Sequence, residues 1–406
     1  MKLFFFRWLV GFTVLFVLLV PFPYAVLPSS GELLRPITEP LVQWLGDAVF
    51  QLPRPYTSRI LSDSTGLYLL SFGVLVFSGL VAVGWTLLVP GRRTSGFLWY
   101  WFHTAVCYFL ALQLLKYGVD KLCKHQFYLP EPNTLFTPLG YLPPDLAYWS
   151  VLGTSRGYSL FTGTLEVVPA LLLLAGRTRL LGAVLALIVL LNVVAVNFAF
   201  DISVKLHASF LLLLSVVAAW PALQTIYAAL VLKRWQPDQP QPPAKATGGS
   251  FSVLAWLVAA LFVSEALVPF LQTRTFNDDQ VKRPWLHGAY ALTLQVKNGD
   301  TISPAANQPQ ALRRLFIHRQ GYLITQSATE QLHDYRLTYT AGGTVLLLRD
   351  SDGSLSRLVC TRAADGSWLQ LRGTLGPDSV NLLTRPLAWQ QLPLLQKGFH
   401  WTTDSY

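Results

Sequence analysis

The hydrophobic positions form long apolar runs over most of the chain. Each run is close to the ~20 residues that cross a hydrocarbon core, and the runs occupy residues 4–19, 67–89, 97–118, 158–174, 180–200, 206–231 and 251–271. The first run is short, so a cleaved signal peptide is its alternative reading, although Arg7 interrupts it and no small-residue cleavage site follows. The pattern predicts about seven membrane-spanning helices.

The last part of the chain has a different pattern. Short alternating or β-rich runs occupy residues 289–296, 315–325, 335–339, 344–348, 355–361, 368–372 and 379–383. Turn signals such as Asn298-Gly299-Asp300 and Asp365-Gly366 separate them. We expect an antiparallel β-barrel or sandwich with a filled core, an apolar ligand inside being the alternative. No catalytic arrangement is predicted here, because the histidines are scattered: His318, His333 and His400.

These patterns give a membrane α-helical bundle followed by a C-terminal β-domain. Residues 37–52 form an amphipathic segment that lies either on the membrane surface or against the bundle. The expected divisions are N-terminal helices at 1–96, a four-helix membrane core at 97–234, a Pro- and Gly-rich linker at 235–250, a last helix at 251–271 and the β-domain at 272–406.

Composition agrees with a protein whose surroundings are a lipid bilayer. Of 406 residues, 52% are hydrophobic and only 13% are charged, and the mean hydropathy is +0.41. Three cysteines without a C-x-x-C motif argue against a disulfide framework, a zinc site or a thioredoxin-like centre. His103 and Cys107 have ligand spacing, but two ligands do not make a site, so no metal is expected. A disulfide between Cys123 and Cys360 is one possibility that the sequence leaves open.

The basic residues predict an orientation. The net charge is +10, and we expect no nucleic-acid partner, because the cations lie beside the ends of the spans. With a cytoplasmic N-terminus, the short inner loops hold a dense set of cations: Lys2, Arg7, Arg92, Arg93, Arg177, Arg179, Lys233, Arg234 and Lys245. An odd number of spans then places the β-domain on the outer side of the membrane.

Charged and polar residues gather near the end of the span at 97–118. Gln113, Lys116, Asp120 and Lys124 share one helical face, so Asp120 is expected to pair with Lys116 or Lys124. A charge inside a bilayer costs about 3 kcal/mol or more, so such residues normally face a bundle interior. The candidate ligand-binding residues are Lys116, Tyr117, Asp120, Lys121, Glu166, Asn197, Asp201 and Lys205.

Two interpretations of this set are open. In the structural one, acids and lysines neutralise each other and fix the helix packing. In the functional one, they line a cavity in which Glu166 or Lys116 binds the head group of a lipid- or quinone-like ligand, while aromatic residues hold its apolar tail. Glu265, alone in the last span, either pairs with a core lysine or lies at the outer edge.

Short motifs in the membrane core carry a family resemblance. They are Gly118-x-x-Lys121, Gly163-x-x-Glu166, the apolar residues 171–174 before Gly176-Arg177-Thr178, Gly182, the stretch Phe200-Asp201-Ile202-Ser203-Val204-Lys205-Leu206, and Gly398-Phe399-His400-Trp401 at the end of the tail. Together they resemble the DoxX-like (DoxD-like) membrane family, in particular a longer subgroup with extra helices and a β-rich tail.

The resemblance implies a bacterial inner-membrane protein with a periplasmic β-domain. Some relatives are similar to subunits of a thiosulfate:quinone oxidoreductase or to maturation partners of periplasmic redox proteins. This sequence differs from a redox pattern because it lacks paired cysteines, which argues against a thiol mechanism. Three function classes stay open: an enzyme or redox subunit with a quinone-like cofactor, a lipid carrier, and an assembly factor whose β-domain binds an extracytoplasmic protein.

Overall fold

The computed structural model describes residues 2–58, 62–89, 95–233, 249–303, 308, 310–340 and 343–396. The chain forms two compact units, one of residues 1–126 with 156–278 and one of residues 127–155 with 279–406. The second unit thus includes 127–155, which lies inside the range 97–234 expected as one membrane core. Linker residues 235–248, Arg92, Arg93 and the terminal Gly398-Phe399-His400-Trp401 lie outside the described residues.

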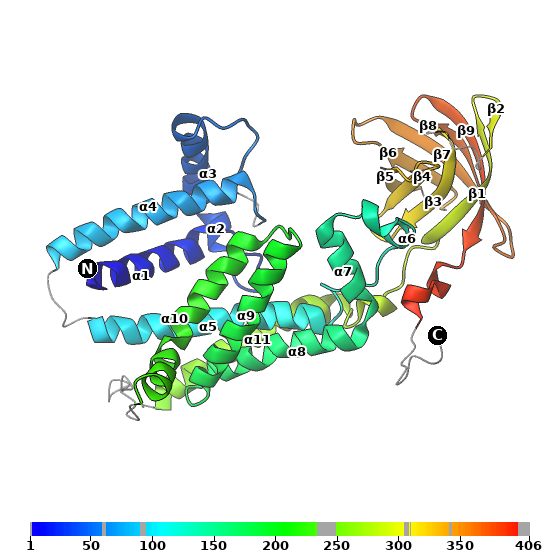
Figure 1. Ribbon diagram of the computed structural model, residues 1–406. Coiled ribbons are helices and arrows are strands. Elements are labelled where there is room, and N and C mark those ends of the chain that lie inside the picture. Colours follow the sequence, from blue (N-terminus) through cyan, green and yellow to red (C-terminus); the bar gives the residue numbers. More distant parts are fainter. Residues whose placement is uncertain are drawn as a thin grey trace. The chain divides into compact units, whose positions relative to one another are not determined.

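The first unit is a bundle of long apolar helices (Figure 1). Neighbouring pairs in contact are α1 with α4, α5 with α8, α8 with α9, α9 with α10, and α5 with both α10 and α11. Their bounds are α1 Lys2–Leu19, α4 Thr65–Leu88, α5 Ser95–Leu122, α8 Arg156–Leu174, α9 Arg179–Ala199, α10 Lys205–Leu230 and α11 Gly249–Thr273.

Six helices in the described ranges are long and apolar enough to span a membrane, which confirms the membrane bundle. The predicted seventh, α1, is equally apolar but has 18 residues. At 1.5 Å per residue it is about 27 Å long, at the short end of the range for membrane-spanning helices. The described residues therefore hold six longer apolar helices and one shorter apolar helix where about seven spans were predicted.

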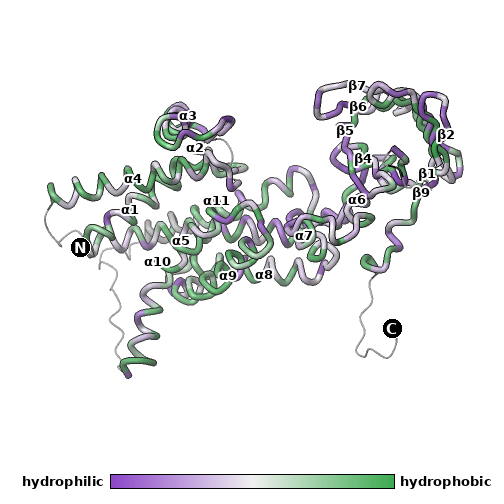
Figure 2. Tube along the Cα trace, turned by 45° about the horizontal axis from the view of Figure 1, so that its top comes forward, coloured by the Kyte–Doolittle hydropathy of each residue, from purple (hydrophilic) through white to green (hydrophobic). Residues whose placement is uncertain are grey.

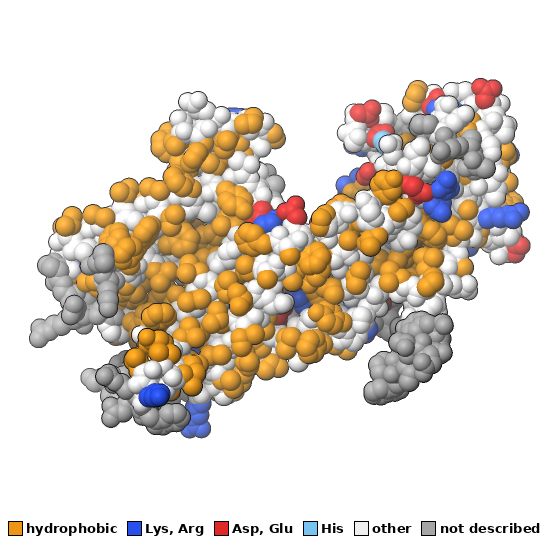
Figure 3. Space-filling model, in the orientation of Figure 1, with side chains coloured by type: hydrophobic (Ala, Val, Ile, Leu, Met, Phe, Trp, Pro, Cys, Tyr) orange, Lys and Arg blue, Asp and Glu red, His pale blue; other side chains and the backbone are white. Residues whose placement is uncertain are grey.

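The outer surface of the bundle is apolar, as a lipid-facing surface requires. Leu80, Leu88 and Ile188 are 66%, 83% and 60% exposed. In Figure 2 the tube is hydrophobic along most of α4 and α9, and in Figure 3 hydrophobic side chains cover the helices while charged ones gather over the strands. Water would disfavour such a surface, whereas hydrocarbon does not.

Arg7 stands in the apolar helix α1 for a local reason. It is 2% exposed, and its guanidinium donates hydrogen bonds to the backbone oxygens of Trp85 and Val89, each at 2.9 Å. The last carbonyls of a helix have no intrahelical partner. Arg7 therefore satisfies the C-terminal end of α4 and joins it to α1.

The expected amphipathic segment, residues 37–52, folds as most of α3 (Arg35–Trp44) and the π-helix η1 (Leu45–Val49), and the short helix α2 (Ser30–Leu33) precedes it. Val42 and Leu45 are buried at 0% and 5% exposure, whereas Ile37 and Trp44 are 66% and 58% exposed. One face thus packs on the bundle, and apolar side chains also remain on the outside.

The second unit is an antiparallel barrel. Strands β1 and β3 to β9 pair in sequence order, and pairing of β1 with β9 closes the sheet into a ring, visible in Figure 2. The short strand β2 pairs antiparallel with the C-terminal end of β1. The bounds are β1 Gly288–Lys297, β2 Asp300–Ile302, β3 Leu312–His318, β4 Tyr322–Ser327, β5 Leu332–Tyr339, β6 Val345–Arg349, β7 Leu355–Arg362, β8 Leu369–Leu375 and β9 Asp378–Leu387.

The predicted β-rich run over 315–325 contains parts of two strands. These are β3 and β4, joined by a turn that ends at Gly321, whose φ is +74°. Glycine adopts this left-handed conformation without the steric cost that other residues meet. The turn contains no Asn-Gly or Asp-Gly pair, the usual hairpin signal, so apolar residues on both sides read as one continuous strand.

Side chains fill the barrel interior, as expected. Leu315, Leu346, Leu358, Leu371 and Leu382 come from different strands and are all 0% exposed. Cys360 lies in the same core, and Cys107, Cys123 and Cys360 are all free, so the structure contains no bridge between Cys123 and Cys360. An eight-stranded barrel has room for little more than its own side chains.

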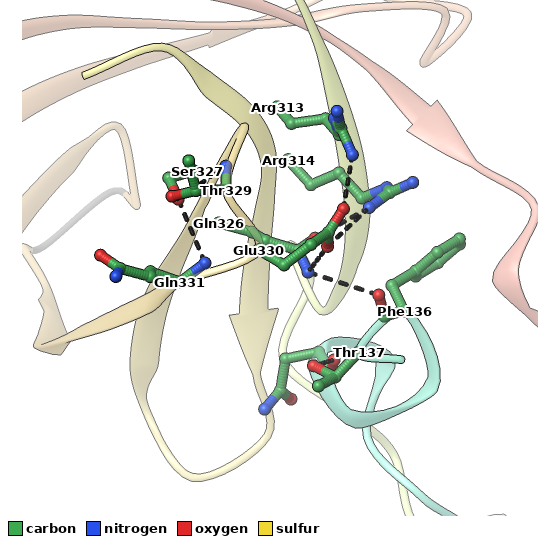
Figure 4. A network of polar contacts seen from close by, with 10 residues as sticks. Phe136, Thr137, Arg313, Arg314, Gln326, Ser327, Thr329, Glu330 and Gln331 are labelled. Atoms are coloured by element: carbon green, nitrogen blue, oxygen red, sulfur yellow. Dashed lines mark hydrogen bonds and ion pairs between the residues drawn. The ribbon is translucent and has the colours of Figure 1, made fainter. Parts of the chain in front are cut away.

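Residues 127–155 cover one side of this barrel. They contain α6 (Pro132–Leu135), the 3₁₀ turn η2 (Leu139–Tyr141) and α7 (Pro144–Thr154). Phe136 packs on Phe316, with ring centroids 6.0 Å apart. Beside it, the Gln326 amide donates to the Glu330 carboxylate at 2.7 Å and to the Phe136 carbonyl at 3.3 Å (Figure 4).

Two leucines of β7 test the filled interior. Leu358→Ala should lower the free energy of unfolding of the barrel by about 2–5 kcal/mol, because it removes a fully buried side chain. Leu355→Ala on the same strand should cost under about 1 kcal/mol, since Leu355 is 70% exposed. Denaturant unfolding of the full chain followed by tryptophan fluorescence measures both; equal losses would contradict a packed interior.

Candidate functional site

A close contact between two glycines organises the membrane core. A Cβ atom on Gly118 of α5 would lie 3.0 Å from the Gly163 carbonyl oxygen of α8, and one on Gly163 would lie 2.8 Å from the Gly118 oxygen. Any side chain here would push the backbones apart. The Ser159 hydroxyl also donates to the Lys121 carbonyl at 2.6 Å. Helices α5 and α8 are therefore held together at their backbones.

The two residues that follow these glycines by three positions form an ion pair. Lys121 Nζ lies 2.8 Å and 3.0 Å from the two Glu166 carboxylate oxygens, and the side chains are 9% and 6% exposed. Residues three apart share a helix face, so the glycine contact brings Lys121 and Glu166 opposite each other. The motifs Gly118-x-x-Lys121 and Gly163-x-x-Glu166 meet as one structural unit.

A second ion pair joins α5 to α11. Lys116 Nζ lies 3.0 Å from a Glu265 oxygen, and Glu265 also accepts hydrogen bonds from the backbone N–H groups of Ala25, Val26 and Leu27. Lys116 donates to the Pro23 carbonyl as well. Of the two alternatives for Glu265, pairing with a core lysine is confirmed. Of the two lysines expected as partners of Asp120, Lys116 pairs with Glu265 instead.

A third set of charges fixes the junction between α9 and α10. Asp63 accepts hydrogen bonds from the backbone N–H groups of Lys205 and Leu206 at 2.8 and 3.0 Å, so it caps the start of α10. Lys205 pairs with Asp201 at 2.7 Å. The Asp201 side chain is 81% exposed, which places it outside the core. Residues 200–204 form the turn between the two helices, since α9 ends at Ala199 and α10 begins at Lys205.

Two buried polar side chains at this junction lack protein partners. His207 is 3% exposed and Asn197 is 4% exposed. Neither ring nitrogen of His207 nor the Asn197 amide nitrogen has a hydrogen-bond partner in the described part of the chain. The His207 ring stands between Phe22 at 5.4 Å and Tyr117 at 6.0 Å, centroid to centroid. Buried polar groups normally have partners, so these atoms are open to an additional hydrogen-bonding group.

The structure therefore groups the predicted residues around α5 but distributes their charges. The last turns of α5 carry Lys116, Tyr117, Asp120 and Lys121. Lys121 Nζ lies 5.9 Å from the centre of the Tyr117 ring. Glu166 and Asn197 are buried beside α5 and α10, while Asp201 and Lys205 belong to the exposed junction. Sequence reasoning missed Tyr24, whose hydroxyl accepts from Gln113 at 3.4 Å, and Asp63.

The pair His103 and Cys107 has a structural explanation. His103 Nε2 lies 2.9 Å from the Ala218 carbonyl oxygen, and its Nδ1 lies 3.9 Å from the Cys107 sulfur. Both ring nitrogens thus have protein contacts. Over the described ranges, no group of three or more metal-ligating side chains occurs.

In the second unit, Glu131 gathers basic groups that the sequence analysis treated as scattered. Its carboxylate meets His287 at 2.8 Å, Arg319 Nε at 3.3 Å and His318 at 3.9 Å. Burial raises the pKa of Glu131, but the hydrogen bond from His287 and the charge of His318 outweigh it, so that the pKa lies below its ordinary value of 4.5. His333 instead pairs with Asp350, and His400 lies outside the described residues.

Replacement of Glu166 tests the core ion pair. Glu166→Gln should lower the thermal stability of the purified protein by the equivalent of about 3 kcal/mol, because it leaves the Lys121 ammonium buried without an anion. Replacing both partners, as in Lys121→Met with Glu166→Leu, should restore most of that loss. Glu32→Gln is the matched control, since Glu32 forms an exposed pair with Arg35. A double variant less stable than Glu166→Gln alone would contradict this account.

The Glu131 cluster should make the stability of the second unit depend on pH. Because the pKa of Glu131 is lower in the folded chain, the unfolded chain binds the proton more tightly, and stability falls as pH drops from about 4.5 through the folded value. Glu131→Gln should lower stability at pH 7 and flatten the curve below pH ~4.5. Unfolding midpoints between pH 7 and 3 measure the effect; parallel curves for the two proteins would count against it.

Comparison with known proteins gives one relative without an assigned role. No family model matches the chain, and no solved structure matches it. Over 121 residues the chain is 31% identical to the uncharacterized protein YwoB of Bacillus subtilis (strain 168), a match that covers 28% of this chain and 71% of YwoB. The chain therefore belongs to the same family as YwoB.

Proposed function

We propose that this integral membrane protein binds a lipid- or quinone-like molecule in its helical unit, with the ligand's polar head beside His207 and Asn197. The observation that carries the proposal is the pair of buried side chains without hydrogen-bond partners in the described structure. A buried donor left without a partner costs about 1–3 kcal/mol. A bound molecule that supplies acceptor atoms removes this cost.

The chemistry of the two side chains defines the head group. A neutral imidazole offers one donor and one acceptor, and the Asn197 amide nitrogen offers donors. Carbonyl oxygens, as in a quinone, or the ester and hydroxyl oxygens of a lipid head match these donors. Phe22 and Tyr117 flank the His207 ring and provide flat apolar surfaces for the adjoining part of the ligand.

The ion pairs take a positioning role in this proposal. Lys121 with Glu166 and Lys116 with Glu265 are matched charges, so neither carboxylate is left over to bind a ligand. They hold α8 and α11 against α5, next to Tyr117. Glu166 and Lys116 thereby shape the site through the helices, in place of the direct ligand contact considered from the sequence.

The location of the protein is part of the proposal. The density of Lys and Arg beside the spans supports a cytoplasmic N-terminus, and the resemblance to DoxX-like proteins supports a bacterial inner membrane with the barrel in the periplasm. The same resemblance supports an interaction with a periplasmic redox or maturation protein. The ligand would then serve as a quinone-type cofactor or as a transported lipid.

A second candidate function rests on the outer wall of the barrel. Leu347, Leu355 and Val359 are 43%, 70% and 45% exposed on the neighbouring strands β6 and β7. Apolar side chains that cluster on an aqueous surface commonly mark a protein contact. In this alternative the barrel binds a protein partner during assembly, and the helical unit anchors it.

The test is the identity and amount of molecules that copurify with the protein. After extraction in mild detergent, mass spectrometry should find a quinone or lipid at near one molecule per chain. His207→Phe, which keeps a flat aromatic ring but removes both nitrogens, should reduce the amount of bound molecule about tenfold or more, as the loss of a hydrogen bond of about 1.4 kcal/mol predicts. Asn197→Leu should act in the same direction.

Ser215→Ala is the matched control. Ser215 is buried in the same helix α10, but its hydroxyl bonds to the Leu212 carbonyl of its own helix at 2.7 Å. This variant should retain the ligand. Absence of any stoichiometric molecule, or equal amounts in His207→Phe and Ser215→Ala, would show that water fills the site and would favour the assembly function.

A further inference from the structure

The outer wall of the barrel contains a groove, lined by both polar and apolar side chains, that the proposed function does not use. It lies over β1, β8 and β9 and has a volume of about 650 Å³, within the range of small-molecule sites. Its lining residues are Thr293, Ser367, Trp368, Gln370, Leu383 and Arg385.

An irregularity in the sheet builds one side of the groove. In the pairing of β1 with β9, Leu292 faces Thr384 and Leu294 faces Leu383, so Thr293 is the extra residue of a β-bulge. Leu292 and Leu382 belong to the barrel core, and the alternation of strand residues turns Leu383 outward. Bulges redirect side chains and are frequent beside functional sites.

Both hydroxyl groups of the groove donate their hydrogen atoms to acceptors within the protein. The Thr293 hydroxyl donates to the Leu383 carbonyl at 3.0 Å, and the Ser367 hydroxyl donates to the Asp365 carboxylate at 2.7 Å. Hydrogen bonds from the Ser367 backbone N–H and hydroxyl hold the pKa of Asp365 below its ordinary value, so this carboxylate only accepts. Each hydroxyl therefore presents acceptor lone pairs to the groove and favours a ligand with O–H donors.

Arg385 and Trp368 supply the other two contacts. Arg385 is exposed and forms no ion pair within the described ranges of the chain. A guanidinium binds a carboxylate through two parallel hydrogen bonds. Trp368 is 36% exposed, and its indole offers a flat surface for a ring with C–H groups on one face. Hydroxyl donors, one carboxylate and an apolar ring face occur together in acidic sugars.

We infer that this groove binds an acidic saccharide, with the carboxylate on Arg385, hydroxyl groups on Thr293 and Ser367, and a sugar ring on Trp368. The site is independent of the ligand proposed for the helical unit. It gives the barrel a binding role of its own, toward a polysaccharide or glycan that carries carboxylates.

Two sugars that differ by a carboxylate provide the test. N-acetylmuramic acid carries a lactyl carboxylate that N-acetylglucosamine lacks. The full chain in lipid nanodiscs, free of sugar-based detergent, should bind the acid at least about tenfold more tightly in ligand-observed NMR titrations, as one charged hydrogen-bonded pair predicts. Arg385→Gln should abolish this preference for the acid, and Trp368→Ala should weaken the binding of both sugars.

Arg357→Gln is the matched control. Arg357 is also an exposed arginine on the outer wall, on β7, but it does not line the groove, so the preference for the acid should persist. Equal binding of the two sugars, no binding of either, or a preference that survives Arg385→Gln would overturn the inference. Binding of an acidic peptide of glutamates with neither sugar bound would assign the groove to a protein ligand instead and would equally overturn it.

Discussion

The membrane core depends on the backbone contact between Gly118 and Gly163. Lys121 and Glu166 can be buried only as a pair, because a single charge inside the bundle would cost about 3–5 kcal/mol or more once its partner is removed. Pairing at 2.8 Å requires the two helices to approach at their backbones. A Cβ atom on either glycine would prevent this approach, so the small residues and the charges form one requirement, repeated at the same spacing on α5 and α8.

The remaining buried acids of the bundle are likewise paired with lysines or backbone N–H groups. Glu265 is fully buried in α11 but is surrounded by Lys116 and three backbone N–H groups, and Asp63 is satisfied by the start of α10. Other buried polar atoms also lack a hydrogen-bond partner in the described part of the chain, among them Thr13 Oγ1 and one Arg156 guanidinium nitrogen. His207 differs from these because both of its ring nitrogens lack a partner, and the Asn197 amide nitrogen near the same helix junction lacks one too. Buried polar groups normally have a partner, so a ligand or water can supply one here.

The apolar pattern predicted the elements well, because a bilayer demands long apolar helices and a half-buried strand demands alternation. It could not predict partners. Lys116 and Glu265 are 149 positions apart, and nothing in either helix identifies the other as its neighbour. The glycine motifs did indicate Lys121 and Glu166 as a set, but through family resemblance. Asp120 was assigned to Lys116 or Lys124 by helix spacing alone, a preference of only about 0.5 kcal/mol, and for Lys116 a buried acid from another helix overrides it.

The barrel leads to a different kind of constraint. Its interior is occupied by leucines from every side, so any binding by this unit must use its outer wall. One part of that wall, around Phe316 and Ile324, is covered by residues from 129–136 and by Trp389. The uncovered strands carry the apolar set at β6 and β7 and the groove at β1, β8 and β9. The groove differs from the apolar set because its hydroxyls, its guanidinium and its indole each specify a different chemical group, and only a ligand that combines all three satisfies them at once.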